Sequence, residues 1–554
     1  MEWLCVRGFA QKLRRVDVAR ARRTEHLGDW RLVKDNTVRT VLRLPDPESP
    51  EGPGLFLKRY KFRDLGRSVR HLAVPTKPQV EWRACRALQA IGVPTCDVLA
   101  IGLRRRWGVP QEGFLISREI AEVTSLDRFL RQQSHPHSIL PVARELARLT
   151  ASLLRNGLFH NDYHSGNLLV RADAADGQRV FIVDLHSFRR RHIGRRHATA
   201  MLAKLACSTD ASALNPRVKA CFLEHLLHNW RGLDEVYAPD VQRWSCRVRR
   251  EMERQHRRHM RSRTRRCLKE SSLFTGEKTE SFTVRRRRDF PLEAALAAVA
   301  LHRKAVDGEA DGVQVRGEAR RTEVTVCPSE SVPPRTKNKP APAAEVLPGK
   351  VCVKAFRRVT LRERLKDSLR PRSRARVAWV AARGMHVRDI PAPQPLALLE
   401  SRRKLSGEPD YLIAEAIEHE GSLTEFLMRA EPPERQLRRL SDTVARLLVH
   451  MAEEGVYHPD TKPANILVRR EEDGFPLCLV DLDRVRFDAR MWRGRWVKVL
   501  ARVNAGLPEG ISVLHRMRCL RGCAAGRWSA AKRLKITRNV QGLSRTRGRP
   551  DLPE

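Results

Sequence analysis

The sequence lacks a long apolar run, a secretion signal and a cysteine framework. Its longest nearly unbroken apolar stretch, Leu292 to Leu301, covers about ten residues, whereas a membrane-spanning helix needs about 20. The basic opening segment, MEWLCVRGFAQKLRRV, has no apolar core and no small-residue cleavage site, so we do not expect a secretion signal. The 12 cysteines are scattered, and the close pair Cys519 and Cys523 has no second pair with which to complete a zinc site. We therefore expect reduced thiols and a cytoplasmic protein.

Acidic residues are scarce relative to basic ones. The 554 residues include 107 Lys and Arg but only 64 Asp and Glu, which gives a formal net charge of +43. Such a charge indicates an anionic partner, and a nucleic acid, an anionic membrane surface and a phosphorylated substrate all fit it. Biased codon usage is the alternative source of the arginine excess, so only local clusters of basic residues count as evidence for a partner. Hydrophobic residues make up 41% of the chain, which is enough to build folded cores and excludes wholesale disorder.

The chain contains one internal repeat. The segment HNDYHSGNLLVR (160–171) matches HPDTKPANILVR (458–469), and the apolar segments FIVDL and CLVDL place Asp184 and Asp481 at nearly the same spacing. Matched positions stay between 296 and 298 residues apart from Lys58 and Lys354 to Asp184 and Asp481. Chance matches would not keep one spacing, so we infer a duplicated domain.

Both copies predict the same order of secondary structure: two strands, a helix, a further strand and a long helix. In the first copy we expect strands over 37–44 and 55–60, a helix over 79–91, a strand over 114–120 and a helix over 141–156. In the second copy we expect strands over 322–327 and 350–356, a helix over 375–387, a strand over 411–417 and a helix over 434–454. An additional strand region over 273–284 and a helix over 292–304 precede the second set.

Each copy carries, in order, residues suited to phosphoryl transfer. A lysine on the second strand is followed by a His-x-Asp-x₄-Asn segment and then by an aspartate that ends an apolar strand. This order is typical of the protein-kinase fold, in which catalysis consists of positioning and charge neutralisation. We expect Lys58 and Lys354 to hold the α- and β-phosphates of ATP. We expect Asp162 and Asp460 to accept or orient the proton of the acceptor hydroxyl.

Two further positions in each copy have the chemistry of magnesium ligands. Asn167 and Asn465 stand five residues after the aspartate of the His-x-Asp segment, and Asp184 and Asp481 follow the apolar strands. Amide and carboxylate oxygens are hard ligands that suit Mg²⁺. We therefore predict that each Asn–Asp pair holds the Mg²⁺ that bridges the phosphates of ATP. A kinase-like fold that has lost catalysis is the alternative.

The copies differ at the expected partner of the lysine. Glu81 lies on the helix after the Lys58 strand, and we expect it to pair with Lys58, with a solvent-exposed glutamate as the alternative. The aligned residue of the second copy is Ala378. Neither copy has a GxGxxG loop, so other groups must cover the phosphates. These departures favour a pseudokinase role, as a regulatory or scaffold module, for the second copy, whereas its intact Asp and Asn residues oppose that role.

The predicted architecture is therefore α+β, with two tandem bilobal protein-kinase-like domains. Each domain has a small β-rich N-terminal lobe and a helical C-terminal lobe. We place domain 1 at residues 1–250, a basic helical junction at 251–268, and domain 2, with a basic C-terminal tail, at 269–554.

The segments around the second site resemble the bacterial lipopolysaccharide kinase (Kdo/WaaP) family. HPDTKPANILV followed by LCLVDLDRVRF is similar to that family's catalytic and metal segments, whereas HNDYHSGNLLV resembles kinases of the aminoglycoside and choline type. Lys462 stands two residues after Asp460, as a lysine does in Ser/Thr protein kinases, and we expect it to contact the nucleotide. The resemblance implies ATP, Mg²⁺ and transfer of the γ-phosphoryl to a sugar hydroxyl of the lipopolysaccharide core. It also implies work at the inner face of the cytoplasmic membrane.

The segments after Asp184 and Asp481 indicate the kind of acceptor. They are short and contain no Ala-Pro-Glu motif, which favours a small or glycan acceptor over a protein. They are also rich in arginine, whose planar fork suits phosphate and carboxylate. We hypothesise that these side chains grip an anionic acceptor such as a phosphorylated or Kdo-bearing glycolipid, and a solvated basic loop is the alternative. The arginines are Arg189, Arg190, Arg191, Arg195 and Arg196 in the first copy, and Arg484, Arg486, Arg490, Arg493 and Arg495 in the second.

The basic tail over 516–549 suggests peripheral contact with an anionic membrane. No DNA- or RNA-binding motif accompanies the charge, so we do not expect sequence-specific nucleic-acid binding. Three alternatives to a lipopolysaccharide kinase stay open: a kinase for a protein or a small metabolite, a pseudokinase scaffold, and a nucleic-acid-binding protein supported by charge alone.

Overall fold

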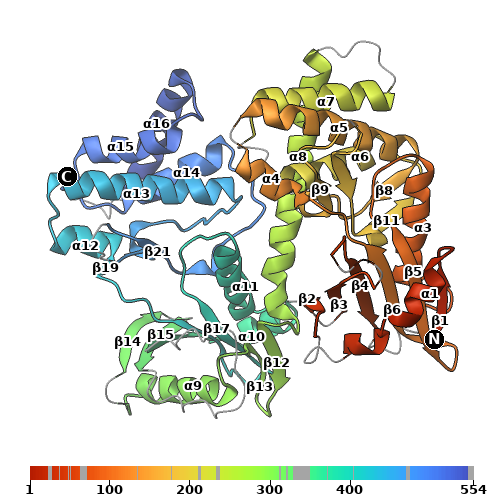
Figure 1. Cartoon of the computed structure of the whole chain (residues 1–554). Coiled ribbons are helices and arrows are strands. Elements are labelled where there is room, and N and C mark those ends of the chain that lie inside the picture. The colour runs from red at the N-terminus through yellow and green to blue at the C-terminus, as the bar shows by residue number, and fades with distance from the viewer. Residues whose placement is uncertain are drawn as a thin grey trace, which may run out of the picture. The chain divides into compact units, whose positions relative to one another are not determined.

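The computed structural model of the chain divides into two compact units, Met1–His256 (unit 1) and Arg257–Glu554 (unit 2). Each unit contains an antiparallel sheet and a mainly helical part (Figure 1). The predicted α+β architecture with two tandem kinase-like domains is therefore confirmed. The structure describes all residues except 23–27, 36–37, 48, 50, 63–70, 134, 176, 210–213, 232–237, 311–312, 320–321, 329–349, 371, 404, 470–473 and 547–554.

The N-terminal lobe of unit 1 is a six-stranded sheet between two helices. Its strand order is β1-β5-β6-β4-β3-β2. Side chains alternate between the faces of a strand, so Phe114 and Ile116 pack with α1, whereas Leu115 packs with α3. The elements are β1 (Glu2–Cys5), α1 (Phe9–Arg15), β2 (Arg31–Asp35), β3 (Arg39–Leu44), β4 (Leu55–Lys61), α3 (Lys77–Ala90), β5 (Val98–Arg106) and β6 (Val109–Arg118).

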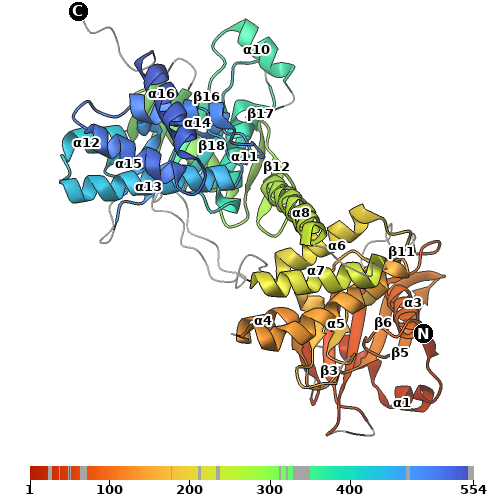
Figure 2. The same cartoon turned by 90° about the horizontal axis from the view of Figure 1, so that it is seen from above.

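The C-terminal lobe of unit 1 is built around the amphipathic helix α5 (Pro136–Arg155). This helix begins earlier than the predicted residue 141 and continues through Pro141, because Ile139 in its first turns is buried in the core. Helix α7 (Pro216–Arg231) lies alongside α5 in both views (Figures 1 and 2). The other elements are β7 (Thr124–Ser125), α4 (Leu126–Gln132), β8 (Leu158–His160), β9 (Leu168–Val170), β10 (Val180–Ile182), β11 (Phe188–Arg190) and α6 (Arg195–Ser208).

Unit 2 repeats this plan with one additional strand in its sheet. The strand order β12-β13-β17-β18-β16-β15-β14 matches that of unit 1, with β12 added at the edge. The predicted strand region over 273–284 is a hairpin of β12 and β13, and the predicted helix over 292–304 is α9. The elements are β12 (Phe274–Lys278), β13 (Phe282–Arg287), α9 (Leu292–Val306), β14 (Gln314–Ala319), β15 (Thr322–Pro328), β16 (Lys350–Phe356), α10 (Leu361–Ser368), α11 (Arg374–Val387), β17 (Pro395–Ser401) and β18 (Asp410–Glu415).

Much of the predicted basic tail belongs to the helical lobe of unit 2. Ile536 and Val540 of α16 are buried in the same core as Cys523 of α15, because one apolar face of each helix turns inward. Residues 547–549 of that tail lie outside the described residues. The elements of this lobe are β19 (Gly421–Ser422), α12 (Leu423–Arg429), α13 (Glu434–Glu453), β20 (Ile466–Val468), β21 (Leu477–Leu479), α14 (Arg493–Ala505), α15 (Val513–Ala524) and α16 (Ala530–Arg545).

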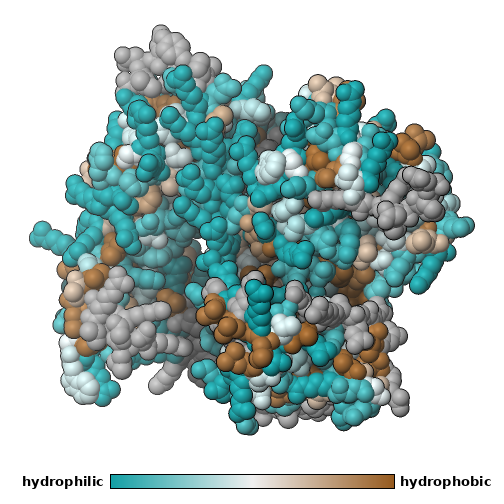
Figure 3. Space-filling model, turned by 180° about the vertical axis from the view of Figure 1, so that it is seen from behind, coloured by the Kyte–Doolittle hydropathy of each residue, from teal (hydrophilic) through white to brown (hydrophobic). Residues whose placement is uncertain are grey.

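The predicted basic junction falls on a long helix, α8 (Ala238–Arg265). Its last part belongs to unit 2, where Arg261 donates to Asp488 at 2.6 and 3.0 Å. Within the described residues no helix is long and apolar enough to span a membrane. The face shown in Figure 3 is mostly hydrophilic, with apolar residues in scattered groups, as the large excess of arginine and lysine leads one to expect.

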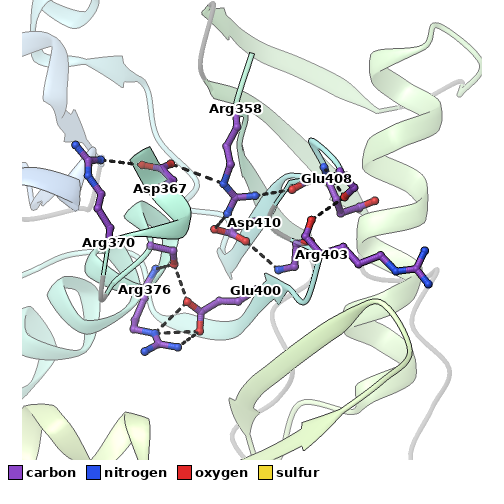
Figure 4. Close-up of polar contacts among 11 residues, drawn as sticks. Arg358, Asp367, Arg370, Arg376, Glu400, Arg403, Glu408 and Asp410 are labelled. Carbon is purple, nitrogen blue, oxygen red and sulfur yellow. Dashed lines mark hydrogen bonds and ion pairs between the residues drawn. The ribbon is translucent and has the colours of Figure 1, made fainter. Parts of the chain in front are cut away.

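A buried ion pair organises the N-terminal lobe of unit 2 (Figure 4). The guanidinium of Arg358 donates to Asp410, and each of these side chains is only 4% exposed. Arg358 also donates to the backbone carbonyl of Glu408 at 2.7 Å, and the second carboxylate oxygen of Asp410 accepts from the backbone N–H of Ser401 at 2.9 Å. Burial raises the pKa of Asp410, although Arg358 acts in the opposite direction. The pair fastens the start of β18 to the segment that follows β16.

Candidate active site

In unit 1 a cavity of about 1050 Å³ lies between the sheet and the helical lobe. Strands β3 and β4 form its roof, and the segment over 117–124 that connects the two lobes forms one wall. Three of the predicted site residues, Lys58, Asn167 and Asp184, line it together. A cavity of this size accommodates a nucleotide.

Lys58 pairs with Glu81 beneath the sheet. The Nζ of Lys58 lies 2.9 Å from Oε2 of Glu81, whose side chain is fully buried. Lys58 faces α3 because the neighbouring Leu57 points into the core on the opposite side of the sheet. The hydroxyl of Tyr60 also donates to Glu81. Burial lowers the pKa of Lys58, but the charges of Glu81 and Asp184 more than offset this and leave its pKa raised.

Asp184 gathers three basic groups at the end of β10. Its carboxylate lies 2.8 Å from Nδ1 of His186, 2.9 Å from Nη1 of Arg39 and 3.8 Å from Nζ of Lys58. Its backbone is left-handed, with φ 60°, and this turns the carboxylate out of the strand direction. Burial raises the pKa of Asp184, but the hydrogen bond from His186 and the charge of Lys58, together with Arg39, hold it well below its usual range.

The sequence analysis did not single out Arg39, Tyr60 or His186, which complete this cluster. The alternation of side chains along the strands could have indicated two of them, Arg39 and Tyr60. Arg39 and Tyr60 are direct partners across β3 and β4, and Tyr60 stands two residues after Lys58, so both share the face of the lysine. Finding them requires the strand register, which the sequence alone did not fix.

Asp162 does not line this cavity, but it belongs to the loop that Asn167 holds and has an accessible carboxylate. Its side chain is 55% exposed, and its nearest basic neighbour is Nε2 of His164 at 3.6 Å. The side-chain amide of Asn167 donates to the backbone carbonyl of Asp162 at 3.0 Å, which holds the loop in shape. An exposed carboxylate in this place is free to meet an incoming hydroxyl.

Asp162 is preceded by His160, which is fully buried beneath Asp184. Its Nε2 lies 3.4 Å from the carbonyl oxygen of Asp184, its Nδ1 has no hydrogen-bond partner among the described residues, and its ring packs on Phe188 at 4.5 Å. Burial lowers the pKa of His160 to about 4. The ring is therefore neutral at physiological pH and links the two aspartates structurally.

This burial predicts a pH dependence of stability. The unfolded chain binds a proton at His160 near pH 6.5, whereas the folded chain does so only near pH 4. The free energy of unfolding should therefore fall as the pH drops from 6.5 to 4, by about 3 kcal/mol from this residue. His160→Gln should reduce that slope in urea titrations at several pH values, and the exposed His192→Gln should not. Equal slopes for wild type and His160→Gln would contradict the prediction.

In unit 2 the corresponding residues form a simpler cluster. Nζ of Lys354 lies 2.6 Å from Oδ1 of Asp481, whose backbone has the same left-handed φ, 59°. Ala378 is buried at the position of Glu81, so Lys354 has its ion pair with Asp481 alone within the described part of the chain. Burial raises the pKa of Asp481, but the charge of Lys354 leaves it lowered.

The loop around Asp460 keeps the arrangement seen in unit 1. The amide of Asn465 donates to the backbone carbonyl of Asp460 at 2.9 Å and to its carboxylate at 3.2 Å. Nζ of Lys462 lies 3.9 Å from the same carboxylate. The structure thus brings Lys462 to the aspartate.

The residues present fit a magnesium ion in both units. Asn465 uses its amide hydrogens on Asp460, which leaves its Oδ1 as an acceptor, and Lys354 is the one ion-pair partner of Asp481 in the described part of the chain. These oxygens are the hard ligands that Mg²⁺ prefers. In unit 1 Asp184 offers the same chemistry, but both of its carboxylate oxygens accept hydrogen bonds from Arg39.

Arginines lie close to Asp481 in unit 2. A cavity of about 610 Å³ is lined by Arg370 and Arg372, which precede α11, by Arg374 at its start, and by Arg484, three residues after Asp481. Arg374 donates to Asp483 at 3.0 Å, whereas Arg372 and Arg484 have no acidic partner among the described residues. In unit 1, Arg189 and Arg190 are exposed on β11. The predicted arginine clusters thus include exposed cations.

Comparison with known proteins identifies relatives of both units. The model of the lipopolysaccharide kinase (Kdo/WaaP) family matches residues 58–237 and 349–509. The lipopolysaccharide core heptose(I) kinase WaaP of Pseudomonas aeruginosa is 28% identical over 185 residues, which cover 31% of this chain and 69% of that protein. A solved structure of WaaP in complex with acyl carrier protein is 22% identical and has a TM-score of 0.35. It covers 46% of this chain and 98% of that one.

Proposed function

Because the chain belongs to the lipopolysaccharide kinase (Kdo/WaaP) family, we propose that it transfers the γ-phosphoryl of ATP to a hydroxyl of a lipopolysaccharide-core sugar or a related anionic glycolipid. The observation that carries this proposal is the convergence of Lys58, Asn167 and Asp184 on one nucleotide-sized cavity. The chemistry of these groups is that of phosphoryl transfer, not of a general anion-binding surface.

Each predicted residue has a physical part in this reaction. Lys58 neutralises the α- and β-phosphates, and Glu81 holds its ammonium in place. Asn167 and Asp184 hold Mg²⁺, which supplies charge neutralisation at the phosphates. Asp162 takes the proton as the acceptor oxygen bonds to the γ-phosphorus, and the bond from that phosphorus to the β-phosphate oxygen breaks to release ADP.

Unit 1 is the better candidate for the catalytic copy. It has the complete pair of Lys58 and Glu81, whereas unit 2 has Ala378 in place of the glutamate. A lysine without that partner is held less firmly for the phosphates. We assign unit 2 the same ligands, Lys354, Asn465 and Asp481, with weaker or regulatory activity.

An anionic glycan acceptor fits the surroundings of both sites better than a protein. Only residues 185–194 separate Asp184 from α6, which leaves little room for a platform that holds a peptide. The exposed arginines after each metal aspartate offer charge-assisted bonds to phosphate or carboxylate groups. The relative from Pseudomonas aeruginosa is named for a heptose of the lipopolysaccharide core. The excess of positive charge also supports peripheral contact with the anionic inner face of the cytoplasmic membrane.

Transfer of radiolabelled γ-phosphate from ATP to purified lipopolysaccharide core tests this function. We expect magnesium-dependent label on core oligosaccharide, less on core treated with phosphatase and then repurified, and little on casein or choline. The double variant Asp184→Asn, Asp481→Asn serves as the inactive control. Label on protein or choline but not on core would replace the proposed acceptor. No transfer to any acceptor, without magnesium-dependent binding of ATP, would favour a scaffold.

A further inference from the structure

Neither unit has a glycine-rich loop over its phosphate site, yet unit 1 has a charged group in that place. We propose that Arg39 binds the phosphates of the nucleotide in unit 1 and so takes the role that the backbone N–H groups of a glycine-rich loop have in protein kinases. The inference rests on the nucleotide binding proposed above. It names a ligand of that site, a nucleoside triphosphate held by a guanidinium.

The position of Arg39 carries the argument. It is the first residue of β3 and lines the cavity from its roof, on the same side as Lys58. Its side chain is only 19% exposed and points to the floor of the cleft, where Nη1 and Nη2 reach Asp184 at 2.9 and 3.3 Å. Lys58 meets the same carboxylate oxygen at 3.8 Å. Two cations from the roof thus converge on the group that is expected to hold magnesium.

The chemistry of the guanidinium suits this exchange. A largely buried cation needs an anionic partner, because an unpaired buried charge is costly. If Asp184 were engaged by Mg²⁺, triphosphate oxygens would offer Arg39 an anionic partner, and its planar fork would fit two of them at once. The contact with Asp184 is then the position that the Arg39 side chain takes when no nucleotide is bound.

Unit 2 supplies a natural comparison within the same chain. The residue that stands two positions before the cross-strand partner of the lysine is Arg39 for Lys58 and Thr322 for Lys354. A threonine brings no charge to the phosphates. Among the described residues, the roof of unit 2 thus has no arginine at this position, which agrees with the assignment of unit 1 as the main nucleotide site.

The alternative is that Arg39 only stabilises Asp184 and the cleft. The phosphate-binding role and the structural role predict different effects on the binding of different ligands. A phosphate ligand affects ATP but not adenosine, whereas a structural residue affects both, because both need the intact cleft.

Isothermal titration calorimetry on the full chain separates the two. Lys354→Met is present throughout to silence unit 2, and ATP with Mg²⁺ is compared with adenosine. We expect Arg39→Gln to raise the Kd for ATP by about 10- to 100-fold, as the loss of a charge-assisted bond pair does, and to leave the Kd for adenosine within about twofold. Arg39→Lys should fall between wild type and Arg39→Gln. The exposed Arg31→Gln on the neighbouring strand β2 should change neither.

Each other result overturns the inference. An unchanged Kd for ATP in Arg39→Gln means that Arg39 does not touch the phosphates. If Arg39→Lys and Arg39→Gln each weaken the binding of ATP and of adenosine equally, Arg39 has only a structural role. If neither ligand binds before Arg39 is changed, the proposed function of unit 1 fails and the inference falls with it.

Discussion

Replacing Asp162 by asparagine is expected to slow phosphoryl transfer to lipopolysaccharide core by about 10²- to 10⁴-fold. Asparagine keeps the size of the side chain and the backbone contact from Asn167, but it cannot take the proton of the hydroxyl. The carboxylate is exposed and lies apart from Lys58 and Asp184, so the Kd for ATP should stay within about twofold. Single-turnover transfer and nucleotide titration on the same preparation measure the two effects separately.

Asp460→Asn is the matched control, because it removes the corresponding carboxylate of unit 2. With Ala378 in the place of the glutamate, unit 2 should contribute little, and the rate should fall by less than about threefold. A large loss in Asp460→Asn with none in Asp162→Asn would move the catalytic assignment to unit 2. Large losses in both would mean that the two sites work on one product or depend on each other.

Most of the fold was predictable because the repeat presents most of the helices and strands twice in the sequence. The predicted strands over 55–60 and 350–356 are β4 and β16, and the helix over 375–387 is α11 to within one residue. Strand alternation and helical periodicity are local signals, so they survive in a single sequence. The order of lysine, His-x-Asp, Asn and Asp was also readable, because short motifs keep their spacing.

The remainder depends on contacts between distant segments. Arg39 and Asp184 are 145 residues apart, and their contact follows from the closure of one lobe over the other. From the sequence, α15 and α16 are predicted to be a basic tail, because their arginines outnumber the few apolar residues, such as Ile536, that enter the core. The composition of such a segment shows mainly its charge, whereas a narrow apolar stripe on one face of the helix determines whether it packs into a core.

The ion pair of Arg358 and Asp410 leads to the largest expected loss of stability. Asp410→Ala should destabilise unit 2 by about 3–5 kcal/mol, because it removes the buried partner of the guanidinium and leaves only Asp367, at 3.7 Å from Nε, as an acidic neighbour. The backbone N–H of Ser401 also loses its acceptor. Hydrogen exchange read by mass spectrometry should show faster exchange in β16, β17 and β18, while the peptides of unit 1 keep their protection.

Two further variants decide whether the loss comes from the stranded charge. Replacing both partners, in Arg358→Met with Asp410→Leu, removes the buried charges together and should recover most of the lost stability. Arg438→Met breaks an exposed pair with Glu434, in which both side chains are 58% exposed, and should cost less than about 1 kcal/mol. If the double variant is as unstable as Asp410→Ala, packing around the pair outweighs its charge. If Asp410→Ala resembles Arg438→Met, the pair does not fasten β18 to the segment after β16.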